Sequence, residues 1–407
     1  MANSAHQTSP SPQLILAVNG GSSSIKFAVF DAAIELRRTL SGGIDRIGLS
    51  GGTLKIKDAA TNQSEQAPLA TSGHAEAVER LVEWLAPRTD LSALAAIGHR
   101  IVHGGPTLLQ PCWIDDGVLT ELRRLAPFDP EHLPGELDLI EGFRRATPHA
   151  RQAACFDTSF HRNLPDVART LAIPRQYAAQ GVRRYGFHGL SYSYLVEELS
   201  RLNPAAAAGR VVLAHLGNGA SMAAVASGKC IDTTMAFTPT AGLVMSTRSG
   251  DFDPGLVRYF IEEKGMSALE FHELVNRRSG LLGVSETSSD MRDLLARWAD
   301  DSRAAEAVAL FCYQAKKTIG AYAAALGGLD AIVFSGGIGE NAHEVRAMIC
   351  DGLEYLQVVV DASRNAAGES LISTAASRTR VFVIRTDEER VIATTLRDLL
   401  AAGVADA

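Results

Sequence analysis

The sequence predicts an α/β protein built from two duplicated domains. Strand-like apolar runs alternate with longer helical patterns, which is typical of α/β proteins. Two hairpins with tips of Gly, Ser and Asn recur roughly 195 residues apart, each heading an α/β segment. With 407 residues and 46% apolar composition, the chain can bury more than one core. We therefore expect two domains facing one another, with a ligand cleft between them.

Each predicted element follows from a local pattern. The strand-like runs are LILAVN (14–19), IKFAVF (25–30), AAIGHRIVH (95–103), RVVLAHLG (210–217), DAIVFSGG (330–337) and RVFVIRT (380–386). A helix is predicted over 306–326, where apolar residues recur at helical spacing. Gly327 and Gly328 then predict a left-handed helix end.

Charge and composition exclude several classes of protein. A net charge of −7 argues against nucleic acid or an anionic membrane as the main partner. No apolar run is long enough to span a bilayer, and residues 1–12 read as a disordered leader on a cytoplasmic protein. The five cysteines are widely separated, so we expect reduced, packed side chains rather than disulfides or a metal site.

Three glycine-rich segments are candidate phosphate loops. The first tip, VNGGSSSIKF (18–27), combines glycines with serine donors and Lys26, and the second, HLGNGAS (215–221), has similar chemistry. The third, SGGIGENAHE (335–344), predicts a strand-to-helix turn with an Asn341-led capping box. None is the G-x-x-x-x-G-K-[ST] loop, and each could also be an ordinary structural turn.

Two arginines lie in short glycine-rich loops of this acidic chain. Arg100 belongs to GHRIVHGG, and Arg248 to STRSGDFDPG, just before a helix that Asp253 should cap and Pro254 begin. Each arginine could instead form a surface ion pair. His99 and His103 flank Arg100 on a strand, too far apart to share a metal, and are expected to be structural.

Two carboxylates are expected at strand ends, where α/β enzymes place their chemistry. Asp157 stands in ACFDTSFH and Glu388 in RTDEER, each beside a strand-like run. A Mg²⁺ ion bound to a nucleotide needs one or two carboxylates and keeps several waters. The alternative for each residue is a solvated loop.

Taken together, these segments resemble the acetate kinase (acetokinase) family of the actin, sugar kinase and heat-shock ATPase superfamily. The likeness covers nearly the whole chain in the family's order. It runs through VNGGSSSIKF, GHRIVHGG, FDTSFH, RYGFHGLS, HLGNGAS, DTTMAFTP, MSTRSGDFDPG, SGLLGVSETSSDMRDL, FSGGIGENAHEVR and TDEERVIA. The resemblance implies two actin-like (ribonuclease H-like) domains, at 13–157 plus 390–407 and at 158–389, and a homodimer formed through the second.

The resemblance also implies a role for each candidate residue. The implied catalytic residues are Asn19, Arg100, Asp157, His188 and Arg248. Substrate would contact Arg100, Val102, Phe128 and Pro239, while Asn19 and Glu388 would hold the metal. Nucleotide would be bound by Ser22, Lys26, His215, Asn218, Gly219, Asp290, Met291, Arg292, Gly337, Ile338, Gly339, Glu340 and Asn341.

The implied reaction is reversible transfer of the ATP γ-phosphoryl group to acetate, dependent on Mg²⁺ or Mn²⁺, giving acetyl phosphate and ADP. Acetate is ionised at neutral pH, so the difficulty is charge repulsion rather than proton removal. The alternatives are a kinase for propionate or another short acid, and a nucleotide-binding sensor with impaired catalysis.

The sensor alternative arises because the chain departs from the family at one loop. Where the family writes A-P-L-H-N-P, this chain has APFDPEH, so Asp129 replaces a histidine near the transferred group. A carboxylate at about 5 Å from that group would cost on the order of 3 kcal/mol, roughly a hundredfold in rate. Our hypothesis is that His132 substitutes for the missing histidine.

Two further departures affect specificity. Phe128 replaces the family's leucine beside the acyl methyl group, so the sequence predicts preference for acetate over propionate and little use of butyrate. Met291 stands where the family often has an aromatic residue at the adenine, and a thioether can also lie against a base.

Overall fold

The structure is a computed structural model that describes residues 13–21, 23–32 and 35–405. The predicted leader and Ser22 lie outside these ranges. Within them the chain divides into two compact units, unit 1 (residues up to 159 and from 387) and unit 2 (residues 160–386). The boundaries expected from the sequence, 157 and 389, fall within three residues of these divisions. None of the described helices has the length and apolar character needed to cross a bilayer.

Unit 1 is built on an eight-stranded sheet with the order β5-β4-β3-β2-β1-β6-β8-β7. Its strands are β1 (Leu14–Gly20), β2 (Ser24–Asp31), β3 (Arg37–Asp45), β4 (Thr53–Asp58), β5 (Ser64–Pro68), β6 (Leu94–Ile101), β7 (Cys112–Trp113) and β8 (Arg151–Phe156). β1 to β5 pair antiparallel in sequence order, whereas β1, β6 and β8 run parallel. The predicted first hairpin is therefore confirmed as β1 and β2.

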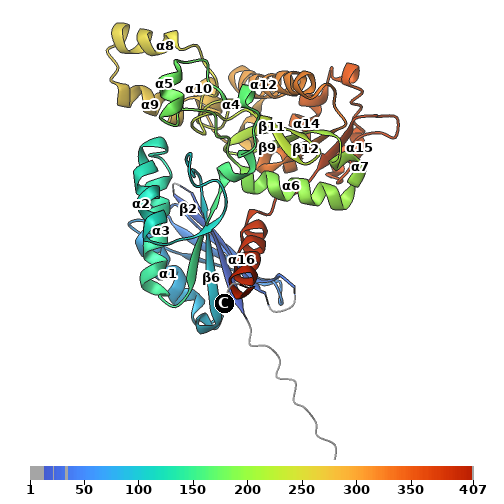
Figure 1. Ribbon diagram of the computed structural model, residues 1–407. Coiled ribbons are helices and arrows are strands. Elements are labelled where there is room, and N and C mark those ends of the chain that lie inside the picture. The colour runs from blue at the N-terminus through green and yellow to red at the C-terminus, as the bar shows by residue number, and fades with distance from the viewer. Residues whose placement is uncertain (1–12, 22, 33–34, 406–407) are drawn as a thin grey trace, which may run out of the picture. The chain divides into compact units, whose positions relative to one another are not determined.

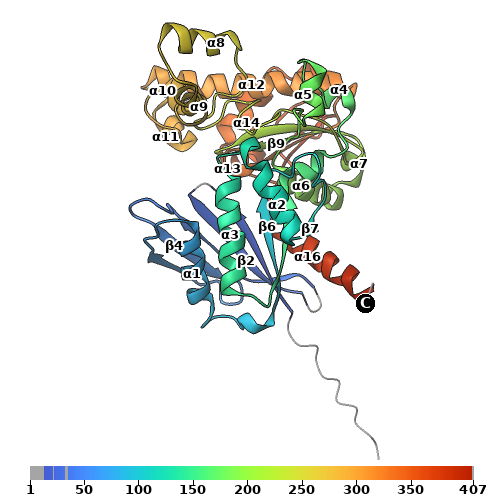
Figure 2. The same cartoon turned by 60° about the vertical axis from the view of Figure 1, so that its left-hand side comes forward.

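Helices cover both faces of the unit 1 sheet (Figures 1 and 2). They are α1 (His74–Leu85), α2 (Asp116–Leu125), α3 (Leu133–Ala146) and α16 (Glu388–Ala405), with short 3-10 turns η1 (Leu91–Ala93), η2 (Ala126–Phe128) and η3 (Asp157–His161). α1 and α3 pack their apolar stripes on one face, through residues such as Leu81 and Phe143. α16 packs on the other face, where Ile392 and Leu396 approach Gly98 so closely that a Cβ there would clash.

Unit 2 contains a five-stranded sheet with the order β11-β10-β9-β12-β13. The strands are β9 (Arg210–Leu216), β10 (Ala220–Ala226), β11 (Lys229–Thr233), β12 (Ala331–Ser335) and β13 (Arg380–Val383). β9, β10 and β11 are antiparallel, and β12 and β13 continue parallel to β9. The strands β3-β2-β1-β6-β8 of unit 1 follow the same pattern of three antiparallel and two added parallel strands, so the predicted duplication is confirmed.

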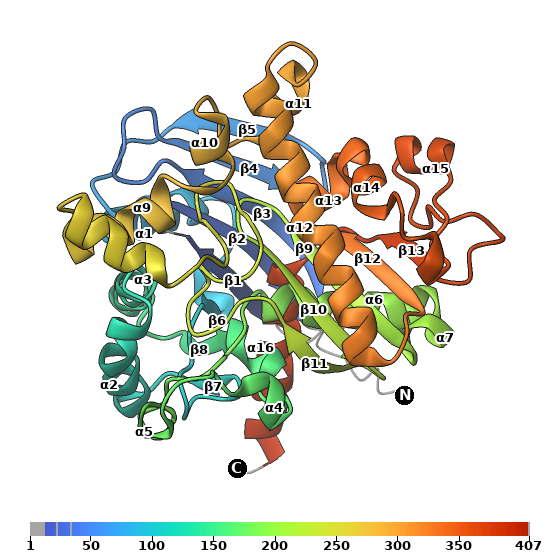
Figure 3. The same ribbon diagram turned by 90° about the horizontal axis from the view of Figure 1, so that it is seen from above.

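The long helix α12 crosses one face of the unit 2 sheet, and α6 packs on the other (Figure 3). The helices are α4 (Asp166–Arg169), α5 (Arg175–Ala179), α6 (Gly189–Leu202), α7 (Pro204–Ala207), α8 (Gly255–Arg258), α9 (Ala268–Arg277), α10 (Gly280–Ser285), α11 (Met291–Arg297), α12 (Ser302–Leu326), α13 (Gly336–Asn341), α14 (His343–Cys350) and α15 (Ala362–Ala367). Short turns are η4 (Tyr259–Glu263) and η5 (Glu354–Leu356). α12 ends at Gly327 with φ 70°, which confirms the predicted left-handed end.

Two predicted helix starts differ from the structure. The Asn341-led capping box is wrong, because Asn341 ends α13 and the residue before α14 is Ala342, which makes no side-chain cap. The side chain of Asn341 instead donates to the Gly337 carbonyl oxygen, 2.9 Å away. At the start of α8 the Asp253 carboxylate accepts from the Gly255 backbone N–H at 2.8 Å, as the predicted cap requires. The helix begins at Gly255, one residue after the predicted Pro254.

Candidate active site

Four of the predicted site residues meet at one edge of the unit 1 sheet. β1, β6 and β8 are parallel, so their carboxyl ends lie at the same edge. Asn19 lies near the end of β1, Arg100 near the end of β6, and Asp157 directly after β8. Glu388 reaches the same edge because it is the first residue of α16.

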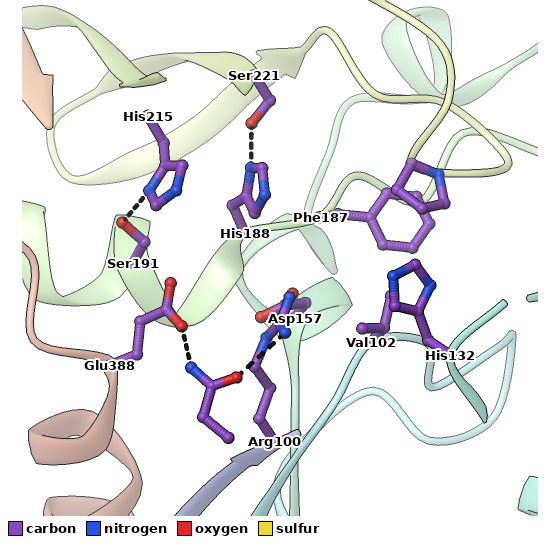
Figure 4. A network of polar contacts seen from close by, with 12 residues as sticks. Arg100, Val102, His132, Asp157, Phe187, His188, Ser191, His215, Ser221 and Glu388 are labelled. Atoms are coloured by element: carbon purple, nitrogen blue, oxygen red, sulfur yellow. Dashed lines mark hydrogen bonds and ion pairs between the residues drawn. The ribbon is translucent and has the colours of Figure 1, made fainter. Parts of the chain in front are cut away.

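These four side chains form one hydrogen-bonded network (Figure 4). The Arg100 guanidinium donates to Asp157 Oδ2 through Nε at 3.1 Å and Nη2 at 2.6 Å. Its Nη1 donates to Asn19 Oδ1 at 3.2 Å, and Asn19 Nδ2 donates to Glu388 Oε2 at 2.7 Å. Each contact fixes one side chain by another, so the network holds the guanidinium in a defined direction.

The network carries more negative than positive charge. Burial lowers the pKa of Arg100, but the charges of Asp157 and Glu388 outweigh it and raise that pKa above its ordinary value. Burial raises the pKa of Glu388, and Asp157 adds to that rise while Arg100 opposes it. Asp157 is fully buried and its Oδ1 has no hydrogen-bond partner. A buried carboxylate oxygen without a donor is expected where a ligand or cation completes the site.

Lys26 lies directly opposite Asn19 in the antiparallel pairing of β1 and β2. Its side chain is exposed, and its charge acts on Glu388. Lys26 therefore adds mobile positive charge at the rim of the network. Ser22, predicted to act with it, lies outside the described residues.

Val102, one of the residues predicted to line the acyl group, contacts Glu136, a carboxylate that sequence reasoning missed. The backbone N–H of Val102 donates to both oxygens of Glu136, at 3.1 and 3.2 Å. Phe128 packs against the core beside α2, with its ring edge-to-face with His103 at 5.6 Å between centroids. Residues 102–103 and 128–136 are thus in contact at two points.

The loop of residues 126–132, where the sequence was expected to differ from the family, contains a carboxylate–imidazole pair. His132 Nδ1 lies 2.9 Å from Asp129 Oδ1 and 3.1 Å from Oδ2. The Asp129 side chain is 3% exposed and that of His132 14% exposed. The Asp129 carboxylate is therefore paired with an imidazole, which reduces the repulsion expected from the sequence.

In unit 2 the second and third glycine-rich segments lie side by side. A Cβ added to Gly217, at the tip between β9 and β10, would be 3.7 Å from the backbone nitrogen of Gly337 in the turn after β12. Gly336 has φ 75° and a Cβ there would meet the Leu216 carbonyl oxygen at 2.7 Å, so only glycine fits this turn. Nothing lies within 4 Å of a Cβ at Gly337, so this backbone is open to a ligand.

Two histidines lie stacked beside these loops, with ring centroids 4.3 Å apart. His188, before α6, has its Nδ1 2.8 Å from Ser221 Oγ, and His215 has its Nδ1 2.8 Å from Ser191 Oγ (Figure 4). Ser221 also contacts the Tyr192 hydroxyl. The serine contacts fix the orientation of each ring. Ser191 and Ser221 were not predicted, because their only sequence signal is that they lie near the two histidines.

Arg248 is close to the tip formed by Gly219. A Cβ at Gly219 would be 3.5 Å from Arg248 Nη1 and 3.2 Å from His188 Nε2, so glycine leaves room for both side chains. Arg248 Nη1 donates to the Pro239 carbonyl oxygen at 3.2 Å. Asn218, at the same tip, is exposed, and its carbonyl oxygen accepts from Ser246 N–H.

The predicted nucleoside residues differ in accessibility. Asp290 caps α11 and pairs with Arg292 at 2.6 Å, and both side chains are accessible. Met291 is 3% exposed and offers almost no surface to a ligand. The Glu340 carboxylate accepts backbone N–H groups of Gly336 and Thr386, so it stabilises the turn.

The comparisons with known proteins agree with this geometry. The profile described as "Acetokinase family" matches residues 14–394. The chain belongs to the acetokinase family. An acetate kinase of Methylocella silvestris is 45% identical over 393 residues, which cover 93% of this chain and 96% of that relative.

Two solved structures in the family align over nearly the whole chain. The acetate kinase of Porphyromonas gingivalis aligns with a TM-score of 0.85 and 35% identity, covering 95% of this chain and all of that one. A propionate kinase of Francisella tularensis aligns with a TM-score of 0.88 and 34% identity, covering 94% and 98%. The fold is therefore the duplicated actin-like ATPase fold of the acetokinase family, and the chain is a nucleotide-binding phosphotransferase.

Proposed function

We propose that this acetokinase family member transfers the γ-phosphoryl group of ATP to acetate, reversibly and with Mg²⁺, giving acetyl phosphate and ADP. The observation that carries the proposal is the Arg100 guanidinium, held by Asp157 and Asn19 at the carboxyl edge of the unit 1 sheet. Such a guanidinium presents a fixed positive charge to a carboxylate, a role for which arginine is better suited than lysine.

The chemistry needs charge neutralisation and alignment. One acetate oxygen forms a bond to the γ-phosphorus, while the bond from that phosphorus to the bridging oxygen of ADP breaks and its electron pair leaves with ADP. Acetate has a pKa of roughly 4 to 5 and is ionised at pH 7, so no group has to remove a proton. The barrier is the repulsion between two anions, which positive charge in fixed positions lowers.

In unit 1, Arg100 binds the acyl carboxylate, and Asp157 holds the guanidinium in place. Asn19 connects Arg100 to Glu388, so substrate and metal ligands belong to the same network. Val102 and Phe128 contribute apolar surface for the methyl group.

The donor set of unit 1 fits a magnesium ion. Among the residues described, no three His, Cys, Asp or Glu side chains gather as a protein-only metal site. Mg²⁺ bound to a nucleotide does not need one, because it takes one or two carboxylates and retains water. Asn19 and Glu388 would hold the ion, and the buried Asp157, whose Oδ1 has no hydrogen-bond partner, belongs to the same network. When bound, the ion would neutralise charge on phosphate oxygens.

In unit 2 we assign the phosphate contacts to the loops that contain Gly217, Gly219 and Gly337, of which Gly337 has open space around its backbone. Lys26, in unit 1, is also assigned to the nucleotide. Arg248 and His188 stabilise negative charge on the transferred group. Asp290 and Arg292 are the accessible candidates for the nucleoside.

The testing experiment traps acyl phosphate with hydroxylamine in the presence of ATP and Mg²⁺. Acetate, propionate and butyrate are compared as acceptors, and EDTA removes the metal. We expect turnover with acetate that EDTA abolishes. Turnover on propionate alone would instead support the second candidate, a propionate kinase. The similarity to the propionate kinase structure of Francisella tularensis is the reason for testing it. No product with any of the three acids would contradict both.

We also propose a homodimer formed through unit 2, on the family resemblance. Sedimentation of the purified chain should give twice the mass of a monomer, and a monomer at micromolar concentration would contradict it.

A further inference from the structure

Glu136 lies on the core-facing side of α3, where an apolar residue is expected. Leu133 and Ile140, three residues before and four after it, belong to the core packed against α2. The Glu136 side chain occupies the same stripe and is only 3% exposed. Buried carboxylates are rare in proteins unless a specific partner requires them.

The partner of Glu136 is the backbone of the predicted acyl wall. Both carboxyl oxygens accept from Val102 N–H, at 3.1 and 3.2 Å. Val102 follows the end of β6 and stands two residues after Arg100. The backbone N–H of Glu136 in turn donates to the His132 carbonyl oxygen at 3.1 Å. Glu136 thus ties the segment that carries Arg100 to the start of α3.

The charges around Glu136 disfavour its ionised form. Burial raises the pKa of Glu136, and the charges of Asp129 and Asp157 raise it further. The charge of Arg100 and the hydrogen bond from Val102 N–H lower that pKa without reversing the net rise. His132 pairs with Asp129 at the start of the same helix, and the His74 ring lies 3.3 Å from the position of a Cβ on Gly135. The surroundings of Glu136 therefore favour its protonated form over its ionised form.

We propose that Glu136 is a positioning residue for the acyl acid: it fixes Val102, and through it the end of β6 that carries Arg100. This inference rests on the proposed function. An ionised Glu136 would join Asp129 and Asp157 in repelling the substrate anion, so the affinity for acetate falls as Glu136 loses its proton.

A purely structural role makes a different prediction. If Glu136 only stabilised α3, its replacement would lower stability while the KM values for acetate and ATP stayed as they are. A positioning role changes the KM for acetate and leaves the KM for ATP unaffected, because no described contact of Glu136 reaches the glycine-rich loops of unit 2.

The experiment compares Glu136→Leu and Glu136→Gln with the parent and with Glu141→Gln, a control on the exposed side of the same helix. Leucine suits the apolar stripe but leaves Val102 N–H without an acceptor. Glutamine keeps an acceptor and cannot ionise. The KM for acetate and the KM for ATP are measured at several pH values from about pH 6 to about pH 9.

We expect Glu136→Leu to raise the KM for acetate at least about tenfold while the KM for ATP changes less than about threefold. In the parent and in Glu141→Gln the KM for acetate should rise with pH, whereas in Glu136→Gln it should stay flat. An unchanged KM for acetate in Glu136→Leu, or the same pH dependence in the parent and Glu136→Gln, overturns the inference. If Glu136→Leu does not fold, the Glu136→Gln profile decides. A parent inactive on every short acid refutes the proposed function itself, whereas an active parent with unaffected variants refutes only the role of Glu136.

Discussion

The carboxylate of Asp129 lies 2.9 Å from Nδ1 of His132, and both side chains are largely shielded from water. The pair sits in the turn before α3, where the His132 side chain makes no capping bond to the helix. A carboxylate at one ring nitrogen orients the imidazole ring and directs Nε2 to the other side. Asp129 therefore orients the imidazole ring of His132.

Replacing His132 tests the hypothesis that its imidazole acts near the transferred phosphoryl group. His132→Ala should lower kcat by about a hundredfold, the usual effect of removing one group that stabilises a transition state. Steady-state kinetics with acetate and ATP give the value, with His149→Ala, on the loop before β8, as the control. Unchanged turnover in His132→Ala would end this hypothesis.

The ion pair of Arg100 with Asp157 should be essential. Asp157→Asn keeps the shape but removes the charge that holds the guanidinium, so kcat/KM for acetate should fall by about a hundredfold or more. Arg100→Lys should not rescue activity, because an ammonium group cannot reproduce the planar donor geometry. Asp116→Asn is the matched control, since Asp116 pairs with Arg144 on the surface. Activity within about threefold of the parent in Asp157→Asn would contradict the proposed role.

The bulk of Phe128 should limit the acyl chain. The parent should favour acetate over propionate and use butyrate poorly. In Phe128→Leu the ratio of kcat/KM for acetate to that for the longer acids should fall by about tenfold, which is the effect of one or two methylene groups in an apolar pocket. The ratios of kcat/KM for the three acids measure this. Equal turnover of butyrate and acetate by the parent would refute the assignment of Phe128.

Two adjacent glycines after β12 should respond differently to alanine. Gly336→Ala forces a Cβ to within 2.7 Å of the Leu216 carbonyl oxygen at φ 75°, and should lower the free energy of unfolding by about 1 to 3 kcal/mol or more. Gly337→Ala meets no atom within 4 Å and should change it by less than about 1 kcal/mol. Urea unfolding of both variants provides the comparison. Equal losses would mean that the turn does not depend on its left-handed glycine.

Stability should depend on pH through Glu136. Its folded pKa is raised, so its contribution is full below the unfolded value of about 4.3 and is lost as pH rises through the folded pKa. Over that window the parent should lose up to about 1.4 kcal/mol per pH unit relative to Glu136→Gln. Chemical unfolding at several pH values tests this, and Glu141→Gln should follow the parent. If the difference in the free energy of unfolding between the parent and Glu136→Gln did not change with pH, the folded pKa of Glu136 would not be raised.

The local patterns of the sequence predicted much of the fold. Alternating apolar runs gave the hairpins β1–β2 and β9–β10, and the paired glycines gave the end of α12, because these features depend on side-chain periodicity and on left-handed backbone conformations near in the chain. The capping box at Asn341 failed because the preceding glycines themselves form α13, so the helix had already begun.

Some residues of the candidate site could also be predicted from the sequence, and others could not. Asp157 and Glu388 could be expected at strand ends from the sequence, whereas Asn19 and Arg100 were assigned to the same site through the family resemblance. Glu136 could not be predicted, because a glutamate in an amphipathic helix ordinarily faces water and nothing in its neighbours marks it as buried.

The sequence by itself determined the family and the duplicated α/β architecture, because these depend on local motifs and their order. Only the tertiary structure decided which groups share a proton, a charge or a backbone donor. The pairing of Asp129 with His132, the Asn19 contact with Glu388 and the burial of Glu136 against Val102 all depend on packing, which sets distances and solvent access that no linear spacing contains.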